Sequence, residues 1–265
     1  MEYQEIEFRV DQGVAWLTLN RPAAMNGLTG QMVQEAGQAI RRCATDDSIK
    51  VVVVGGNGRA FCAGADVKEF ATHLDQGDIA SYVRHIADDL HLNVVVALRR
   101  LPKVVIGMIN GVVAGGGIGL ALAGDIRIAS DQARFTSAYS NIAATPDGGS
   151  TYLLPRIIGP TRAFEFYLLN NVVGADEAQQ MGLVTRVVPH DDLPKEVAAL
   201  AAQLAAGPTL AYGRAKRLYR ETLANDLVTQ LDLETELITE SFLSEDTASG
   251  VKAFLAKQKP VFRGR

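Results

Sequence analysis

Two glycine- and alanine-rich segments of this 265-residue chain are candidates for holding a negative charge. They run from Phe61 to Asp66 and from Asn110 to Gly117, and each follows an apolar run typical of a β-strand. Small residues let another molecule approach the backbone closely, and such turns expose main-chain N–H groups. Amides aimed at one point stabilise an enolate or a tetrahedral oxyanion, and one donor can contribute roughly 100- to 1,000-fold in rate. The pair predicts an oxyanion hole.

Other kinds of catalytic site find less support in the sequence. The segment from Gly148 to Tyr152 is close to a hydrolase nucleophile elbow but lacks the closing glycine. The triple glycine lacks the spacing of a dinucleotide-binding loop, and no Gly-Lys-Ser/Thr phosphate loop occurs. No cluster has the spacing of metal ligands. We therefore expect no metal and no separate cofactor, and no histidine has an evident catalytic setting: His73, His85, His91 or His190.

Composition limits the partners and the compartment. The formal charge is −4, from 26 basic and 30 acidic residues, which gives no footprint for nucleic acid or an anionic membrane. The two cysteines, Cys43 and Cys62, have no disulfide or metal spacing and suit a reducing cytosol, with Cys62 as buried filler. Residues 1–20 show no export signal. We expect a cytoplasmic protein that binds neither nucleic acid nor membrane.

Elements that would position the two turns alternate along the chain. The pattern predicts helices at residues 31–43 and 79–99, an N-terminal strand pair around residues 11–13, and further strands at residues 49–55, 104–109, 125–129 and 184–188. The alternation predicts an α/β core in which parallel strands place both turns on the edge that ligands favour. Residues 104–124 are apolar enough for a membrane span, but their seven glycines favour a buried strand, a turn and a buried helix.

Strand signals stop near residue 192. Helical patterns follow at residues 193–206, 208–223, 227–242 and 247–257. We therefore divide the chain into a core over residues 1–192 and a helical C-terminal subdomain over residues 193–265. An apolar stripe on the third of these helices is expected to pack on the core or on a neighbouring subunit: Leu227, Leu231, Leu233, Leu237, Ile238 and Phe242.

Several motifs together resemble the crotonase, or enoyl-CoA hydratase/isomerase, superfamily over essentially the whole chain. They are residues 20–26 (NRPAAMN), 60–66 (AFCAGAD), 101–103, 110–119, 124–125 and 178–188. Residues 146–156 (PDGGSTYLLPR), 230–234 and 250–257 resemble its phenylacetate-pathway isomerase branch. The resemblance implies a spiral of ββα units, a trimer or hexamer, and an acyl-CoA thioester as substrate.

The same resemblance implies roles for individual residues. The amides of Ala63 and Gly116 would form the oxyanion hole. Coenzyme A would lie along Ala24 and beside Ala63 to Asp66, including Ala65, with Phe254 and Lys257 of the last helix assisting. Asp66 has an alternative role as the N-cap of a short helix that begins near Val67, and Tyr139 is expected to line the acyl pocket.

Two departures from the family pattern point to the reaction. Hydratases of the family carry one glutamate after the triple glycine and another twenty residues later, where this chain has Gly119 and Tyr139. Hydration needs one group for the water and another for the α-proton, so the absence of both carboxylates argues against it. Asp147 stands where the isomerase branch keeps its aspartate. We therefore expect an isomerase that shifts a double bond from 3-enoyl-CoA to 2-enoyl-CoA, with Asp147 as proton shuttle.

Several alternatives share these residues. The substrate is either a 3-enoyl-CoA or an epoxyphenylacetyl-CoA, and weak or absent hydratase activity is a third outcome. Asp147 is also a candidate nucleophile, as in haloaryl-CoA dehalogenases, which carry a histidine before the segment that matches Pro102; His91 looks out of register for that role. A non-catalytic acyl-CoA- or RNA-binding member of the fold would use a basic stripe: Arg214, Lys216, Arg217 and Arg220.

Overall fold

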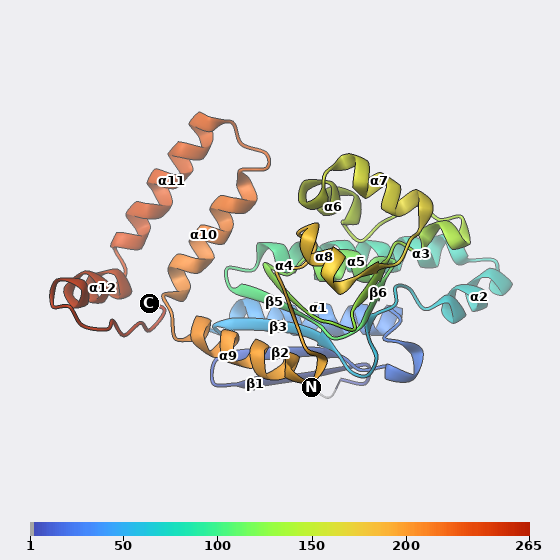
Figure 1. Cartoon of the computed structure of the whole chain (residues 1–265), viewed down its shortest axis with the longest axis horizontal. Coiled ribbons are helices and arrows are strands. Elements are labelled where there is room, and N and C mark those ends of the chain that lie inside the picture. Colours follow the sequence, from blue (N-terminus) through green and yellow to red (C-terminus); the bar gives the residue numbers. More distant parts are fainter. Residues whose placement is uncertain (1–2) are drawn as a thin grey trace.

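The structure is a computed structural model that describes residues 3–265, and two β-sheets form its centre (Figure 1). The six-stranded sheet has the order β1 (Ile6–Asp11), β2 (Val14–Leu19), β3 (Val51–Gly56), β5 (Val104–Ile109), β7 (Ile126–Ser130) and β10 (Arg186–Val188). The four-stranded sheet has the order β4 (Ala60–Cys62), β6 (Val112–Ala114), β8 (Arg134–Thr136) and β9 (Val173–Gly174). Only the β1–β2 and β8–β9 pairs are antiparallel among the paired strands.

The chain repeats one unit three times. β3, β5 and β7 lie in the larger sheet, and each is followed at once by a strand of the smaller sheet: β4, β6 or β8. Helices then lead to the next unit: α2 (Val67–Gln76), α3 (Ile79–Asp89), η2 (Leu90–Val96) and α4 (Ala97–Arg100) after the first, α5 (Gly116–Leu122) after the second, and α6 (Ser150–Ile158) and α7 (Pro160–Leu169) after the third. This is the predicted spiral of ββα units.

The predicted strand and helix within residues 104–124 are present as β5 and α5, and between them lies a further short strand, β6, that was not predicted. The N-terminal pair is the antiparallel hairpin of β1 and β2. Within the described part of the chain, no helix combines the length and the apolar character that crossing a bilayer requires.

The larger sheet is buried on both faces, as parallel sheets usually are. On one face, Val52 and Val54 of β3 share a core with Met32 and Ile40 of α1 (Gly30–Thr45). On the other face, Val51 and Val53 pack with α9 (Leu193–Ala205). α9, which begins just after the boundary predicted at residue 192, thus packs against the core sheet.

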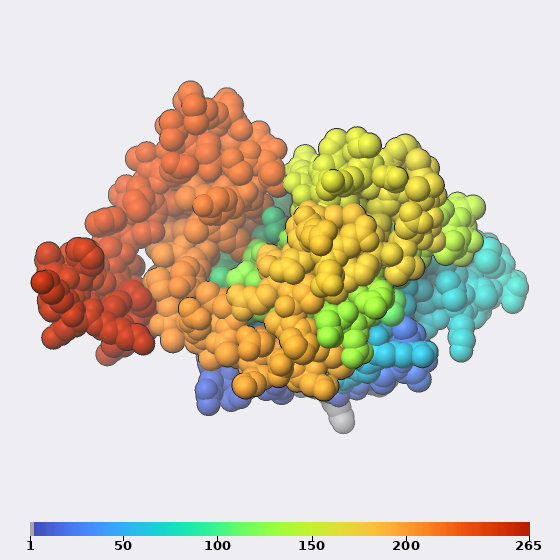
Figure 2. Space-filling view, in the orientation of Figure 1, coloured from blue at the N-terminus to red at the C-terminus, as the bar shows by residue number. Residues whose placement is uncertain are grey.

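The last three helices form an arm, which we define as α10 (Thr209–Glu221), α11 (Leu227–Phe242) and α12 (Glu245–Leu255). The arm projects from the body of the chain, with α12 at its far end (Figures 1 and 2). Of the predicted apolar stripe, Leu237 is buried, whereas Leu227, Ile238 and Phe242 are exposed. The stripe therefore does not pack on the core of its own chain.

The basic stripe predicted on α10 forms salt bridges, one of which attaches the arm to the core. Lys216 lies 2.7 Å from Asp125, which follows the second ββα unit, and donates to the Leu98 carbonyl oxygen at 2.8 Å. The other three cations of the stripe contact glutamates on α10 or α11: Arg214 with Glu240, Arg217 with Glu236, and Arg220 with Glu221. The stripe thus has acidic partners within this chain.

Candidate active site

The two glycine turns lie against each other at the carboxyl ends of neighbouring parallel strands, β4 and β6. Gly64 and Gly115 have positive φ angles of 93° and 51°, which side chains rarely tolerate. A Cβ atom on Gly64 would lie 3.1 Å from the Ala114 carbonyl oxygen, and one on Gly115 would lie 3.4 Å from Gly64 Cα. The glycines therefore permit the close approach of the turns that the sequence predicted.

The backbone amides of these turns differ in their hydrogen bonds. The Ala63 amide, the predicted oxyanion donor, donates to the Met25 carbonyl oxygen at 3.1 Å, so a ligand would have to displace that bond to use it. The Ala65 amide has no acceptor among residues 3–265. Gly116 is the first residue of α5, where an N–H has no partner in its own helix. Ala65 and Gly116 both line a cavity of about 430 Å³.

Asp147 is the acidic side chain in the lining of this cavity. It follows η3 (Tyr139–Ile142) and precedes α6, and its Oδ1 accepts a hydrogen bond of 2.6 Å from Tyr139 Oη. Burial, together with the charge of Asp147, raises the pKa of Tyr139 above its usual value, so the phenol keeps its proton. A Cβ atom on Gly116 would lie 3.9 Å from Asp147 Oδ1. The structure thus places one carboxylate beside the Gly116 turn, with Tyr139 as its donor.

His91 also reaches Asp147, which corrects the expectation that it lies out of register. Its Nε2 atom is 3.4 Å from Asp147 Oδ2 and accepts a hydrogen bond of 3.0 Å from the Gly148 amide. The same nitrogen thus contacts both the loop backbone and the carboxylate of Asp147. His91 lies in η2, a π-helical segment, and such segments shift which residues face a neighbour. An α-helical spacing therefore misplaces this side chain.

The position that follows the triple glycine is closed by backbone. A Cβ atom on Gly119 would lie 1.8 Å from the Gly148 carbonyl oxygen and 2.6 Å from its carbonyl carbon. The loop that carries Asp147 thus occupies the space beside Gly119. Of the two positions where hydratases of the resembled family carry a glutamate, position 119 has no room for a side chain because Gly148 covers it. Position 139 contains a tyrosine in place of a carboxylate.

Asp66 has the structural role foreseen as its alternative. It is the N-cap of α2, accepts from the Lys68 amide at 2.9 Å, and pairs with Arg21 at 2.8 Å. Burial raises the pKa of Asp66, but hydrogen bonds from Arg21 and Lys68 outweigh it, so the pKa lies below its usual range. Ala24 and Asp66 both lie beside Gly27: a Cβ atom placed on Gly27 would lie 3.3 Å from the Ala24 carbonyl oxygen and 3.5 Å from Asp66 Cα.

The structure does not bring Phe254 and Lys257 to this cavity. Phe254 lies on α12 at the far end of the arm, and Lys257 follows that helix by two residues, whereas α2 lies on the opposite side of the molecule (Figure 1). The Phe254 side chain is 83% exposed. The expectation that these residues contact a ligand held beside Ala65 therefore fails within a single chain.

Cys62 lies behind the first turn as a buried free thiol. Burial raises its pKa to about 12, so it is not a nucleophile near neutral pH, as the sequence predicted. No group of three or more metal-ligating side chains occurs between residues 3 and 265. The polar groups that line the cavity thus include backbone amides, the Asp147 carboxylate and the Tyr139 phenol, and the His91 imidazole contacts Asp147.

Comparison with known proteins agrees with this architecture. The sequence profile of the enoyl-CoA hydratase/isomerase family matches residues 9–265. The chain is 38% identical to the 1,2-epoxyphenylacetyl-CoA isomerase of Escherichia coli, over 97% of each chain. It is 34% identical to the trans-2-decenoyl-acyl-carrier-protein isomerase of Streptococcus mutans, over the full length of both.

A solved structure extends the likeness to three dimensions. The crystal structure of an enoyl-CoA hydratase from Bacillus anthracis superposes with a TM-score of 0.92 at 31% identity, covering 99% of this chain and all of the other. The proteins similar to this chain thus include both isomerases and a hydratase on one fold. On its sequence, topology and cavity, the chain belongs to the enoyl-CoA hydratase/isomerase family.

Proposed function

We propose that this protein is an acyl-CoA isomerase that converts 3-enoyl-CoA into 2-enoyl-CoA with a single carboxylate. The observation that carries the proposal is the lining of the 430 Å³ cavity: among its described residues, Asp147 is the one acidic side chain, and it lies beside two loops with unpaired amides. The two isomerases among the similar proteins support this assignment.

In the proposed reaction, the thioester oxygen accepts hydrogen bonds from the Ala65 and Gly116 amides. Asp147 takes a proton from C2, and the C–H electrons form a dienolate whose oxygen carries the negative charge. The same carboxyl group then returns the proton at C4, which leaves the double bond between C2 and C3. One group suffices because the proton leaves and returns on the same substrate.

Tyr139 and the coenzyme A portion complete the assignment. Because the Tyr139 phenol donates to Oδ1, Oδ2 is the oxygen left for the substrate proton. Coenzyme A enters as part of the substrate, along Ala24 and the backbone from Ala65 to Asp66, and no separate cofactor is required. Phe254 and Lys257 serve this site from a neighbouring subunit of a trimer or hexamer, since their own chain holds them away from it.

A second candidate follows from the contact between His91 and Asp147. In it, Asp147 attacks an aryl carbon of a haloaryl-CoA, the halide leaves, and His91 activates the water that hydrolyses the resulting aryl ester. Halide release, together with a mass increase on the peptide that contains Asp147 after rapid quenching, tests this reading. If a 3-enoyl-CoA turns over without any adduct, the nucleophile role is refuted.

The primary test is Asp147→Asn with 3-enoyl-CoA, followed by absorbance of the conjugated product. We expect at least a 100-fold loss of kcat, because the amide cannot carry the proton, with binding of a saturated acyl-CoA retained. Hydration of 2-enoyl-CoA by both proteins is the parallel control and should be absent. Turnover near that of the wild type in the variant would refute the role of Asp147. Conversion of epoxyphenylacetyl-CoA but not of 3-enoyl-CoA would identify the ring compound as the substrate, with Asp147 in the same role.

A further inference from the structure

The short helix that carries Tyr139 lies between two residues in a conformation that they do not favour. Ala138, which precedes η3, has a φ angle of 60°, and Ala143, which follows it, has a φ angle of 54°. Alanine rarely adopts this left-handed conformation, and such residues persist where the surrounding structure holds them. Contacts from outside η3 must therefore fix this segment.

Asn170 makes the contact at the start of the segment. Its Oδ1 atom accepts hydrogen bonds from the Ala138 amide at 2.5 Å and from the Thr136 hydroxyl at 2.9 Å. Asn170 ends α7 with a φ angle of 53°, a position that asparagine occupies more readily than most residues. One half-buried side-chain oxygen thus joins the end of β8 to the residue before Tyr139.

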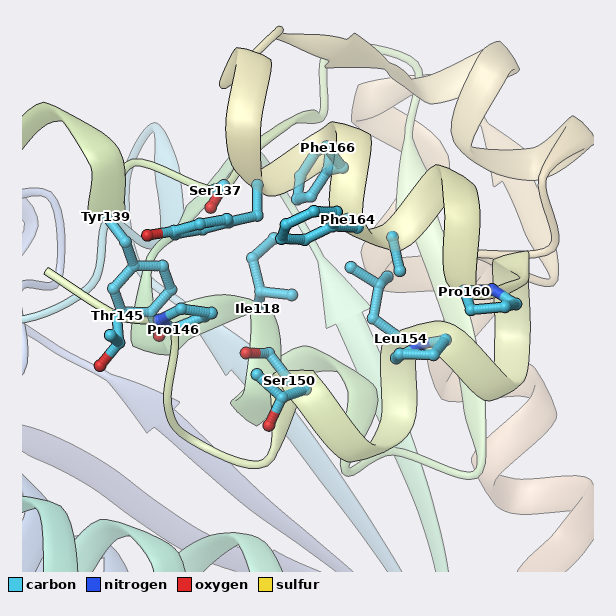
Figure 3. Close-up of a pocket in the computed structure, with 14 residues that line it drawn as sticks. Ile118, Ser137, Tyr139, Thr145, Pro146, Ser150, Leu154, Pro160, Phe164 and Phe166 are labelled. Carbon is cyan, nitrogen blue, oxygen red and sulfur yellow. The ribbon is translucent and has the colours of Figure 1, made fainter.

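The fixed segment presents the Tyr139 phenol to Asp147. Figure 3 shows Tyr139 in the wall of a pocket, on the same side as Thr145 and Pro146 of the loop that leads to Asp147. The phenol donates to Asp147 Oδ1 at 2.6 Å, and His91 Nε2 lies 3.4 Å from Oδ2. Without the phenol, the carboxylate would be free to rotate about its last bond, because that torsion has no narrow preference in aspartate.

We infer that Asn170 is a positioning residue: through the turn at Ala138, its side-chain oxygen holds the Tyr139 phenol in place. The phenol in turn orients the Asp147 carboxylate. Asn170 is not among the described residues that line the 430 Å³ cavity or the pocket of Figure 3, so it acts on the reaction without touching the substrate. The inference rests on the proposed function for the role of Asp147.

Substitutions at position 170 and at its neighbour separate this role from a general effect on the loop. Asn170→Gly keeps the left-handed backbone but removes the acceptor, whereas Asn170→Asp keeps both. Asn171→Gly makes the same change at the next, exposed position. With 3-enoyl-CoA, we expect Asn170→Gly to lower kcat by roughly 10- to 100-fold with KM nearly unchanged, since a small misplacement of a catalytic group costs that much. Asn170→Asp should retain most of the activity, and Asn171→Gly all of it.

A double variant tests the route through the phenol. Tyr139→Phe/Asn170→Gly should be no slower than Tyr139→Phe alone, because no phenol remains for Asn170 to position. Losses that multiply would overturn the inference, since Asn170 would then act by another route. One such route is the Ser137 carbonyl oxygen, which accepts from the Gly115 amide at 3.1 Å. Wild-type kcat in Asn170→Gly, or an equal loss in Asn171→Gly, would also overturn it.

Nuclear magnetic resonance of the Tyr139 ring separates this inference from the proposed reaction, because it needs no turnover. With tyrosine labelled at the ring carbon that bears the hydroxyl, the Tyr139 signal is the one missing in Tyr139→Phe. Asp147→Asn should shift this signal in the otherwise wild-type chain but not in the Asn170→Gly chain. A shift that depends on Asn170 would sustain the positioning role even if 3-enoyl-CoA did not react. Equal shifts in both chains, with 3-enoyl-CoA turned over by the wild type, would refute the role and leave the reaction standing.

Discussion

The Gly116 amide can be tested without disturbing the helix that carries it. Gly116 is the first residue of α5, and proline is well tolerated there because that N–H has no helical acceptor. Gly116→Pro removes the donor, whereas Gly116→Ala keeps it and adds a methyl group at ordinary contact distance, 3.5 Å from the Leu28 and Leu90 side chains. We expect the proline variant to lose roughly 100- to 1,000-fold in kcat and the alanine variant to stay within a few-fold.

Steady-state kinetics with 3-enoyl-CoA, beside melting temperatures of both variants, check this expectation. A proline variant that folds and keeps more than a third of the wild-type kcat would show that the amide does not hold the developing charge. Comparable losses in both variants would instead assign the effect to crowding near Asp147.

At the residue scale, the sequence predicted that the two turns lie on one edge of the sheet, but it could not predict which of their amides already has a hydrogen-bond acceptor. Small residues from Ala63 to Ala65 mark a close approach, but whether an N–H is free depends on a distant carbonyl. The Met25 carbonyl oxygen accepts a hydrogen bond from the Ala63 amide, and the local sequence of neither segment predicts that bond. The Tyr139 hydrogen bond to Asp147 is also formed only when η3 folds back onto the loop before α6.

The packing of α5 against the loop of Asp147 should be intolerant of any side chain at position 119. A methyl group in Gly119→Ala would meet the Gly148 carbonyl oxygen at 1.8 Å, and backbone on both sides prevents simple relief. We expect a loss of about 1–3 kcal/mol in the free energy of unfolding and reduced kcat, because the loop that yields carries Asp147. Gly174→Ala is the control, since its φ is −77° and nothing lies within 4 Å of its Cβ position.

Urea denaturation and isomerase assays on both variants test this packing. An unaltered free energy of unfolding in Gly119→Ala would mean that the loop is free to move, and would reopen the possibility of a glutamate, and hence hydration, at this position.

Asp66 connects the start of α2 to the segment of Arg21 and makes that connection pH-dependent. The lowered pKa of Asp66 means that its stabilisation is complete above the usual value of 3.8 and is lost as the pH falls through the lower folded value. Asp66→Asn keeps an N-cap acceptor but removes the charge that pairs with Arg21. We expect the variant to lose about 1–3 kcal/mol of the free energy of unfolding at pH 7, and this loss should shrink towards pH 3.

Denaturation curves across this pH range measure the loss, with Asp226→Asn, a variant at an exposed N-cap, as the control. A loss that does not change with pH would exclude the charge of Asp66 as its cause.

The elements themselves were largely predictable from periodicity. The helix predicted at residues 227–242 has those bounds, and the strand predicted at residues 49–55 is present as β3 over Val51–Gly56. His91 shows the limit, because its π-helical segment departs from the 3.6-residue period on which sequence patterns depend. α6 and α7 also went unrecognised, although residues of both helices line a cavity beside Tyr139.

At the scale of the whole molecule, the arm is the part whose apolar surface is not covered by its own chain. Its apolar side chains are exposed on α11 and α12, with Phe242 at 65% and Phe254 at 83%. Exposed apolar patches of this kind mark interaction surfaces on soluble proteins. The sequence could not predict that Phe254 and Lys257 lie away from the cavity of their own chain. A resemblance to a family implies a contact with the substrate, but it does not say where the fold places the residues that make it.

A mixed oligomer tests whether the arm completes a neighbour's site. Asp147→Asn lacks the proton shuttle but has an intact arm, whereas the double variant Phe254→Ala/Lys257→Ala keeps Asp147 and should show a raised KM with little change in kcat. Co-expression of the two with different affinity tags, followed by sequential purification, yields oligomers that contain both. In these, an intact Asp147 site receives Phe254 and Lys257 from the other subunit, so kcat/KM per site should exceed that of either variant alone. If each arm served only its own chain, no site in the mixture would be complete, and kcat/KM would stay at the average of the parents.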